Sequence, residues 1–342
     1  MRDFVLCILF VALSLTGCSK PRAGGDFREV TVMADERAWV AAESALVEGL
    51  ERKVLLLDEE SVFWVHHLSV DAIETIRRRP LLVFLATLDG RGPVTDMVSA
   101  LTGKDLSVLA EEAPFTRLLE PWASHQVAYV LVAHTASELD SLASTVVGML
   151  YDDFFDRYRT VVRERLYVRG EDNRLVRELT SRYGWSIRVP RPWGMEEKPE
   201  ERWVHFVKTD PDRHVSVYWE DWAEDSVSPE FCVRTRRDLA WRHYDEDEID
   251  DSRTHYSPVE FLGYPAIEIR GAWTNQKYTA GGPFRTICFV VEEQQRFYLI
   301  DLVTFAPDRP KFYVMTQLDM VAETFVVSPP GANAPGANYG MH

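Results

Sequence analysis

The 342-residue sequence is short of positive charge, and the apolar stretch at its start is too short to cross a bilayer as a helix. Acidic residues outnumber basic residues by 54 to 38, so the formal net charge is −16. A chain this acidic is poorly suited to bind nucleic acid or to dock on anionic lipids by charge. The apolar stretch, residues 4–15, has 12 residues, whereas a membrane-spanning helix needs about 20. We therefore expect no nucleic-acid partner and no transmembrane helix at the start of the chain.

Glycine patterns typical of common catalytic and cofactor sites are also missing. Residues 184–188 lack the second glycine of a nucleophile elbow. Residues 103–104, Gly-Lys, lack the earlier glycine and the following Ser or Thr of a phosphate-binding loop. The glycines in residues 90–92 have no third glycine in register for a dinucleotide. These absences favour a non-enzymatic protein, and we expect no cofactor.

The acidic and histidine-rich stretches do not have the spacing of metal ligands. The acidic run 245–251 has isoleucine and aspartate where a calcium-binding EF-hand needs an oxygen ligand and glycine, which favours a solvated loop. His66 and His67 are adjacent on an expected strand, so their side chains point to opposite faces. His205 and His214 are diagonal neighbours on an expected hairpin, but two imidazoles without a third ligand make a weak site. We predict no bound metal.

The start of the chain has the features of an export signal. One basic residue precedes the apolar run, and two small residues follow it at positions 16 and 17. Residues 15–18, Leu-Thr-Gly-Cys, resemble the lipobox of bacterial lipoproteins, in which the cysteine is lipidated and becomes the first residue. We predict a lipoprotein signal peptide over residues 1–17 and lipid attachment at Cys18. The alternative is an ordinary signal peptide with a cysteine at the cleavage point by chance.

Lipid attachment at Cys18 would set the location of the protein. The resemblance implies a diacylglycerol thioether and an acylated amine such as palmitoyl, and two or more chains anchor a protein stably at about 0.8 kcal/mol per buried CH₂. The tether, residues 18–26, contains Pro and Gly and should be flexible, with a reach below about 30 Å. We expect a lipid-anchored protein of the cell envelope, with the membrane as a partner through its anchor. Ser19 after the cysteine is compatible with the outer membrane, facing the periplasm.

Two cysteines, Cys232 and Cys288, would remain after Cys7 leaves with the signal and Cys18 takes lipid. In an oxidising compartment they could form one disulfide that closes a long loop. Cys232 lies in an expected helix and Cys288 in an apolar strand, so both could instead be buried free thiols. The sequence leaves both alternatives open.

The expected elements divide the mature chain into two domains. Over residues 27–178 strands and helices alternate, which predicts an N-terminal α/β layered domain. Strands are expected at 29–34, 61–70, 80–88 and 125–133, and helices at 36–50, 71–79, 93–112 and 136–167 with a continuation to 182. The run 80–88 is apolar on both faces, as in a central strand buried between layers.

Over residues 179–328 the pattern changes to consecutive hairpins. Strands are expected at 185–190, 203–208 and 214–222 and within 258–274 and 285–306, and helices at 229–244 and 309–325. Ser228 is a suitable N-cap for the first helix, with Pro229 in its first turn. This order predicts a C-terminal antiparallel sheet with flanking helices, and so an α+β fold class. The tail 329–342 repeats Pro-Gly-Ala-Asn and should be disordered.

Four short stretches carry a likeness to one family. They are Glu120-Pro121-Trp122-Ala123 with Gln126, Gly271-Ala272-Trp273, Gly281-Gly282-Pro283-Phe284, and Ala306-Pro307 with Lys311. Their order resembles the bacterial envelope lipoproteins grouped as domain of unknown function 4837, over about residues 27–328, although residues 55–63 lack the prolines of that pattern. The second half is also similar to the PsbP and Mog1-type fold in its opening strand Trp185-Ser-Ile-Arg-Val-Pro190, in Trp193 just after it and in a closing helix after the last hairpin. That fold hosts binding and assembly roles more than catalysis. The family brings no established activity.

Aromatic residues gather in the second half, mostly as expected core. A possible contact surface combines Trp273 with Gly281, Gly282, Pro283 and Phe284, and the alternative is that these glycines form a tight turn between strands. We expect an anchored lipoprotein that binds an envelope protein partner or supports its assembly. The alternative is a small-ligand-binding or hydrolytic protein with a pocket between the two domains. Acids that could serve such a pocket are Asp221, Glu224 and Asp225.

Overall fold

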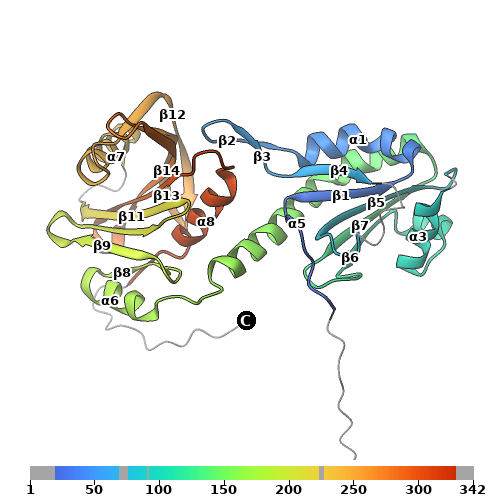
Figure 1. Ribbon diagram of the computed structural model, residues 1–342, viewed down its shortest axis with the longest axis horizontal. Helices are drawn as coiled ribbons and strands as arrows, with labels where there is room; N and C mark the ends of the chain where they lie inside the picture. Colours follow the sequence, from blue (N-terminus) through green and yellow to red (C-terminus); the bar gives the residue numbers. More distant parts are fainter. Residues whose placement is uncertain (1–19, 69–75, 91, 223–226, 329–342) are drawn as a thin grey trace, which may run out of the picture. The chain divides into compact units, whose positions relative to one another are not determined.

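The computed structural model describes residues 20–68, 76–90, 92–222 and 227–328, which fall into two compact units (Figure 1). The first unit contains residues up to Ala45 together with Val65–Val146, and the second contains Leu46–Trp64 and the chain from Val147 onward. Residues 46–64 and 147–178, assigned to the N-terminal domain from the sequence, therefore group with the second unit. Some predictions lie outside the described residues: the signal peptide 1–17, Cys18, most of the helix 71–79, Glu224, Asp225 and the tail 329–342.

The first unit is built on a five-stranded sheet in the order β4-β1-β5-β7-β6. Strands β1, β5 and β7 are parallel, and β6 is antiparallel to β7. The strands are β1 (Glu29–Ala34), β4 (Trp64–Leu68), β5 (Leu81–Thr87), β6 (Phe115–Leu119) and β7 (Val127–Ala133). The helices are α1 (Glu36–Leu50), α3 (Pro93–Thr102), α4 (Leu106–Glu112) and α5 (Ala136–Leu166), of which α1 and α5 contribute residues to both units. Every residue of β5 is buried, as predicted for a central strand.

The Glu120–Ala123 stretch and Gln126 form a closed turn in the first unit. The Oε1 atom of Gln126 accepts backbone N–H groups of Trp122 and Ala123 at 3.1 and 3.2 Å, and its Nε2 atom donates to the carbonyl of Arg79 at 2.7 Å. Gln126 is fully buried, so these bonds satisfy its amide away from water. The turn fixes the loop before β7. These hydrogen bonds give Gln126 and the Glu120–Ala123 stretch a structural role.

The second unit contains a seven-stranded antiparallel sheet in the order β12-β13-β14-β15-β11-β10-β9. Its strands are β9 (Gly194–Lys198), β10 (Trp203–Lys208), β11 (Asp212–Asp221), β12 (Glu248–Phe261), β13 (Tyr264–Asn275), β14 (Ala280–Val291) and β15 (Arg296–Phe305). The remaining elements are β2 (Lys53–Leu55) paired with β3 (Glu59–Ser61), β8 (Trp185–Ser186) paired with β16 (Val326–Val327), helices α6 (Asn173–Tyr183), α7 (Pro229–His243) and α8 (Phe312–Ala322), and short 3₁₀ turns at Pro199–Glu201 and Glu292–Gln294. The predicted α+β class with an antiparallel C-terminal sheet is confirmed.

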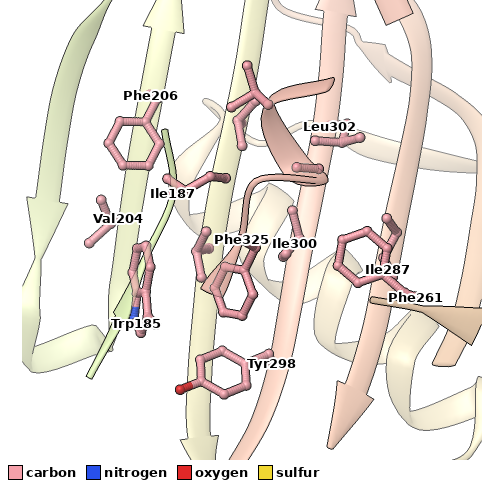
Figure 2. Packing of buried hydrophobic residues seen from close by; sticks show 14 of the residues in the cluster. Trp185, Ile187, Val204, Phe206, Phe261, Ile287, Tyr298, Ile300, Leu302 and Phe325 are labelled. Carbon is pink, nitrogen blue, oxygen red and sulfur yellow. The ribbon is translucent and has the colours of Figure 1, made fainter. Parts of the chain in front are cut away.

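Helices α7 and α8 cover opposite faces of this sheet. Alternate residues of β14 show the division, because Cys288 joins the buried cluster under α7 while Ile287 joins the cluster under α8. Figure 2 shows the α8-side cluster, in which Trp185 stacks on Phe325 with ring centroids 5.7 Å apart, and which also includes Ile300 of β15. Each face therefore has its own core, and each can carry a separate pocket.

The start of α7 follows its sequence signals. Ser228 has an extended backbone, and its hydroxyl oxygen accepts the N–H of Phe231 at 3.2 Å, while Pro229 takes the first helical position. Among the residues that the structure describes, no helix combines the length and the apolar character needed to cross a bilayer.

Candidate functional site

A cavity of about 400 Å³ lies on the α7 face of the sheet, at the C-terminal end of α7. We call it the histidine pocket. Its lining combines imidazoles, carboxylates and aromatic rings, and it is built from six strands, the end of α7 and two connecting turns. Its polar and aromatic walls include His205, His214, His243, Glu196, Asp212, Asp245, Asp247, Asn275, Trp273 and Tyr278. All of these residues belong to the second unit.

The hairpin β10–β11 brings His205 and His214 together. His205 pairs with Ser216 and His214 pairs with Val207, so the two histidines are diagonal neighbours on one face, as predicted. Nε2 of His205 lies 2.9 Å from Nδ1 of His214, and the two rings are almost coplanar, with 2° between their planes. One ring therefore donates the hydrogen bond and the other accepts it, which requires at least one neutral imidazole.

Burial keeps both imidazoles neutral. The pKa of His205 is lowered to about 3, mainly by burial and also by the nearby His214 and His243. Burial also lowers the pKa of His214, against the opposing attraction of Asp212 and Asp301. At neutral pH the pair is uncharged, and it offers the pocket hydrogen-bonding groups rather than positive charge.

Asp247 is the buried carboxylate of the pocket. It is only 6% exposed, and its Oδ1 atom accepts a hydrogen bond from Nδ2 of Asn275 at 2.7 Å. Burial raises its pKa to about 6, although the bond from Asn275 and the charge of Arg236 act in the opposite direction. The prediction of a solvated loop over 245–251 is therefore wrong at this residue, because the chain turns inward after α7.

The turn that carries Asp247 is strained. Asp245 and Glu246 adopt left-handed backbone angles, with φ of 52° and 69°. Such angles cost a non-glycine residue about 1–2 kcal/mol each. The Nδ2 atom of Asn275 also donates to the carbonyl of Asp245 at 2.9 Å, which holds the turn in place. Strain of this kind gathers at functional sites, where a particular side-chain position is needed.

His243 closes the far side of the pocket. Its ring stacks on Trp203 with centroids 4.2 Å apart, and its Nδ1 atom lies 3.3 Å from the ammonium of Lys198. Burial lowers the pKa of His243 to about 4, and Lys198 lowers it further against the pull of Glu201. The ring is therefore neutral at physiological pH, with Nδ1 as the acceptor for Lys198.

A buried ion pair lies under the pocket and cancels its own charge. Arg236 and Asp301 are both buried, with Nε and Oδ1 3.5 Å apart, and Thr286 donates to the same carboxylate oxygen at 2.5 Å. The Arg236 guanidinium also lies 3.9 Å over the ring of Phe284. The charge of Arg236 also attracts Asp247. Lys277 attracts Asp245 and Arg213 attracts Asp212, so basic groups outside the lining compensate part of its negative charge.

The lining therefore has a clear chemical character. Its four carboxylates come from Glu196, Asp212, Asp245 and Asp247, and none of its residues is Lys or Arg. Within the described residues, no three His, Cys, Asp or Glu side chains are grouped to hold a metal ion. Negative charge in the same lining as the rings of Trp273 and Tyr278 suits an organic cation, which rings and carboxylates both attract. The Tyr278 ring already has such a contact, with the ammonium of Lys277 5.1 Å from its centroid.

The residues of the predicted contact surface are placed inside the fold. Gly281 and Gly282 lie within β14 rather than in a turn, where Gly282 pairs with Trp273. A Cβ atom on Gly282 would lie 2.0 Å from the carbonyl oxygen of Thr304 and 2.7 Å from Nε1 of Trp273, so only glycine leaves room for the indole. Trp273 is 6% exposed and lines the histidine pocket. Contact of these residues with a partner protein stays a prediction.

Pro283 and Phe284 are also buried, and they line a second cavity described below. The sequence reasoning found His205 and His214, but it did not connect them with His243, Asp247 and Asn275. These three come from a helix end, a turn and a distant strand, so only the folded sheet brings them together.

Cys232 and Cys288 are free thiols in the structure, and both are fully buried in the α7-side cluster. Burial raises the pKa of the Cys288 thiol, and a hydrogen bond with Cys232 adds to the effect. The two side chains therefore meet within the core, as pairing would require. Their disulfide stays a prediction.

Three solved structures are similar to part of the chain. One is PA94, a protein of unknown function from Pseudomonas aeruginosa, at 11% identity over 42% of this chain and 90% of that chain, with a TM-score of 0.27. Another is from Bacteroides thetaiotaomicron, at 11% identity over 44% of this chain and 48% of that chain, with a TM-score of 0.28. The third is LpqN, involved in cell envelope biogenesis of Mycobacterium tuberculosis, at 14% identity over 42% of this chain and 83% of that chain, with a TM-score of 0.28. TM-scores this low support no argument about function.

No curated protein matches the chain. The family model described as Domain of unknown function (DUF4837) matches residues 172–324. The resemblance predicted from the sequence is therefore confirmed for the second half of the chain. All residues that line the histidine pocket lie within the matched region.

Proposed function

We propose that this protein is a lipid-anchored binding protein of the bacterial cell envelope, which holds a small organic cation in the histidine pocket. The location rests on the lipobox-like residues 15–18, with Cys18 as the point of attachment. The binding role rests on one observation: four carboxylates and no Lys or Arg line a pocket of about 400 Å³. That volume lies within the range of about 300–1,000 Å³ that is typical of small-molecule sites.

Aromatic faces and neutral imidazoles complete the match to a cation. An ammonium group over the face of Trp273 or Tyr278 gains about 0.5–2 kcal/mol, depending on how far it is desolvated. Because the pKa values of His205 and His243 are about 3 and 4, neither ring repels a positive charge at neutral pH. The imidazoles can accept hydrogen bonds from N–H groups of the ligand.

The same pKa values favour binding over hydrolysis. A general base is most effective when its pKa is near the working pH, and His205 with a pKa of about 3 is too weak. Asp247, with a pKa of about 6, is engaged by Asn275. Asp221, one of the acids considered for a hydrolytic pocket, instead pairs with Arg202 at 2.8 Å outside the pocket.

A fluorescence titration tests the proposal, because Trp273 lines the pocket. The mature chain, solubilised in detergent, is titrated with choline and with spermidine, and acetate and glycerol serve as anionic and neutral probes. We expect a saturable response to the cations and none to the other probes. Asp247→Asn should weaken cation binding about tenfold, since one ionic contact in a partly buried site contributes roughly 1.4 kcal/mol.

The matched control is Asp221→Asn, which removes an acid outside the pocket. This variant should bind both cations as the wild type does. If the cations and the neutral probe bind equally well, or if Asp247→Asn leaves cation affinity unchanged, the proposed ligand class is wrong.

A further inference from the structure

A second cavity, of about 210 Å³, lies on the α8 side of the second unit. We call it the arginine pocket. Its basic residues are Arg253, His255, Arg270 and Arg285, from strands β12, β13 and β14. Its apolar wall comes from the β2–β3 hairpin, from α5 and from α8. Nothing in the proposed function uses this cavity.

Strand register explains why the basic side chains meet. His255 lies directly opposite Arg270, and Arg270 lies directly opposite Arg285, so one row crosses three neighbouring strands. Like charges in such positions repel one another and destabilise a sheet. A row of this kind therefore needs compensation from nearby carboxylates or from a ligand.

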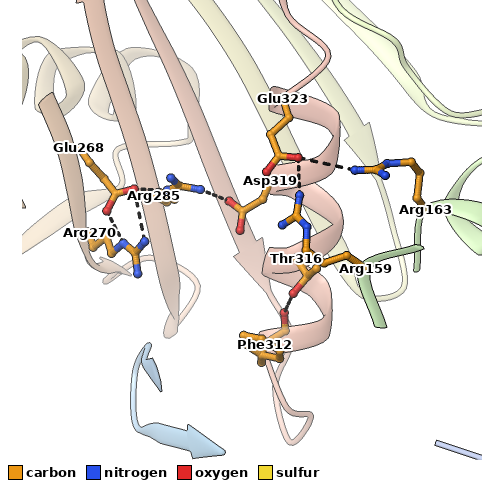
Figure 3. Close-up of polar contacts among 9 residues, drawn as sticks. All are labelled: Arg159, Arg163, Glu268, Arg270, Arg285, Phe312, Thr316, Asp319 and Glu323. Carbon is orange, nitrogen blue, oxygen red and sulfur yellow. Dashed lines mark hydrogen bonds and ion pairs between the residues drawn. The ribbon is translucent and has the colours of Figure 1, made fainter. Parts of the chain in front are cut away.

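Two carboxylates bind the arginines of this row (Figure 3). Glu268 accepts hydrogen bonds from Nε of Arg270 at 2.5 Å and from Nε of Arg285, and Asp319 of α8 accepts from Nη1 of Arg285 at 2.6 Å. Arg253 donates to the carbonyl oxygen of Leu57, which carries no charge. The cavity lining itself thus holds three guanidinium groups and one carboxylate, Asp319. The side chain of Glu268 is only 6% exposed, and Asp250 of β12 attracts Arg253.

Arg270 lies beside apolar surface that water can reach. Its Nε and Nη2 atoms donate to Glu268 at 2.5 and 3.4 Å, and its side chain is 51% exposed, so a ligand can approach the guanidinium from the solvent side. Leu55 of β2 is 58% exposed, and with Phe312 and Met315 of α8 it forms an apolar wall of the same cavity. Positive charge at one end and apolar contact at the other suit an amphiphilic anion.

The β2–β3 hairpin is held over this site by α8. Glu60 accepts the backbone N–H groups of Lys311 and Phe312, at 2.7 and 3.0 Å, in the first turn of α8. On the other side of α8, Arg159 pairs with Glu323 at 2.5 Å. The apolar wall therefore has a fixed position, as a preformed site needs.

We propose that the arginine pocket binds a short carboxylate amphiphile, with the carboxylate at Arg270 and the hydrocarbon against Leu55 and Phe312. Guanidinium groups bind carboxylates with two parallel hydrogen bonds, which selects this anion over a neutral head group. A volume of 210 Å³ corresponds to about seven water molecules of roughly 30 Å³ each, which gives room for a short chain only.

The test uses hexanoate as the probe. The mature lipidated chain is placed in lipid nanodiscs and titrated by calorimetry, with empty nanodiscs as the blank. We expect saturable binding of hexanoate, and binding of hexylammonium and hexanol at least tenfold weaker. Equal binding of hexanoate and hexylammonium would overturn the proposal.

Two substitutions locate the site. Arg270→Gln should weaken hexanoate binding at least tenfold, whereas Arg174→Gln, an arginine whose side chain is 82% exposed on α6, should not. Leu55→Asp should also weaken it at least tenfold, with Leu119→Asp, at a similarly exposed leucine, as its control. Hexanoate affinity that survives both Arg270→Gln and Leu55→Asp contradicts the proposal. Asp247→Asn should leave hexanoate binding unchanged, so the tests of the arginine pocket and of the histidine pocket are independent.

Discussion

At the scale of single residues, Asp247 carries the clearest energetic consequence. Its carboxyl group has a pKa of about 6 in the folded chain, against 3.8 for an ordinary aspartate. The folded state therefore holds this proton more tightly than the unfolded state does. Folding stability falls as the pH rises from about 4 to about 6, and above that range the full cost of the buried charge is present.

Asp247→Asn removes this cost and keeps the acceptor for Asn275. We expect the variant to be more stable than the wild type at pH 8 by about 1–2 kcal/mol, and equally stable at pH 4. Urea unfolding at the two pH values measures the difference. The control is Asp250→Asn, because hydrogen bonds from Ser252 lower the pKa of Asp250 instead. A gain that is the same at both pH values would contradict the assignment to charge burial.

Single residues also mark where the sequence was informative. The diagonal placement of His205 and His214 followed from strand period and from the turn between them, so it could be predicted. The inward position of Asp247 could not, because it depends on a left-handed turn at Asp245 and Glu246. Non-glycine residues rarely adopt the left-handed conformation, and an acidic sequence does not predict it.

At the scale of secondary-structure elements, strongly periodic segments were predicted well. Helix α7 begins at its expected cap, and the fully buried β5 matches its apolar run. The strands that were missed are short or polar. Strand β9, Gly-Met-Glu-Glu-Lys, is an exposed edge strand without apolar alternation, and β6 has an exposed Leu119. Their pairing depends on neighbouring strands rather than on their own pattern.

The β2–β3 hairpin gives a prediction at this scale. Glu60 accepts two N–H groups that α8 cannot satisfy internally, and its negative charge lies at the favourable end of the helix dipole. Glu60→Ala should therefore lower the free energy of unfolding by about 1–2 kcal/mol. Chemical denaturation measures the loss.

Glu59→Ala is the matched control, since Glu59 is the neighbouring, exposed glutamate of the same strand. This variant should unfold at the wild-type denaturant concentration. Glu60→Gln keeps one of the two acceptor oxygens and should lose less than Glu60→Ala. An equal loss for Glu59→Ala and Glu60→Ala would assign the effect to strand propensity and not to the helix cap.

At the scale of the whole molecule, the proposed lipid anchor at Cys18 would hold the protein, and with it both pockets, at a membrane. Cys18→Ser should abolish incorporation of labelled palmitate and leave the protein at its precursor mass. Metabolic labelling and mass spectrometry measure both effects. Cys7→Ser, in the apolar run of the predicted signal peptide, should be lipidated normally. If the Cys18→Ser protein still associates with membranes at its full precursor mass, the uncleaved signal peptide and not a lipid on Cys18 anchors the protein.

Charge is distributed unevenly in this acidic molecule. The formal net charge is −16, and the histidine pocket follows that sign with four carboxylates in its lining. The arginine pocket has the opposite sign, with three arginines against Glu268 and Asp319. Net charge read from the sequence disfavours nucleic acid as a partner, which stays a prediction, but it could not reveal a local reversal of sign.

The grouping of residues 46–64 with the second unit has a practical consequence for anyone who shortens this gene. A fragment that starts at residue 172, where the family match begins, would keep every strand of the seven-stranded sheet. It would lack Glu60, so the first turn of α8 would lose both acceptors, and it would lack Leu55 and Phe155 from the wall of the arginine pocket. Such a fragment should unfold at a lower temperature than the full chain and should not bind carboxylates in the arginine pocket. Adding a peptide of residues 46–64 to the fragment tests whether the missing segment restores both properties.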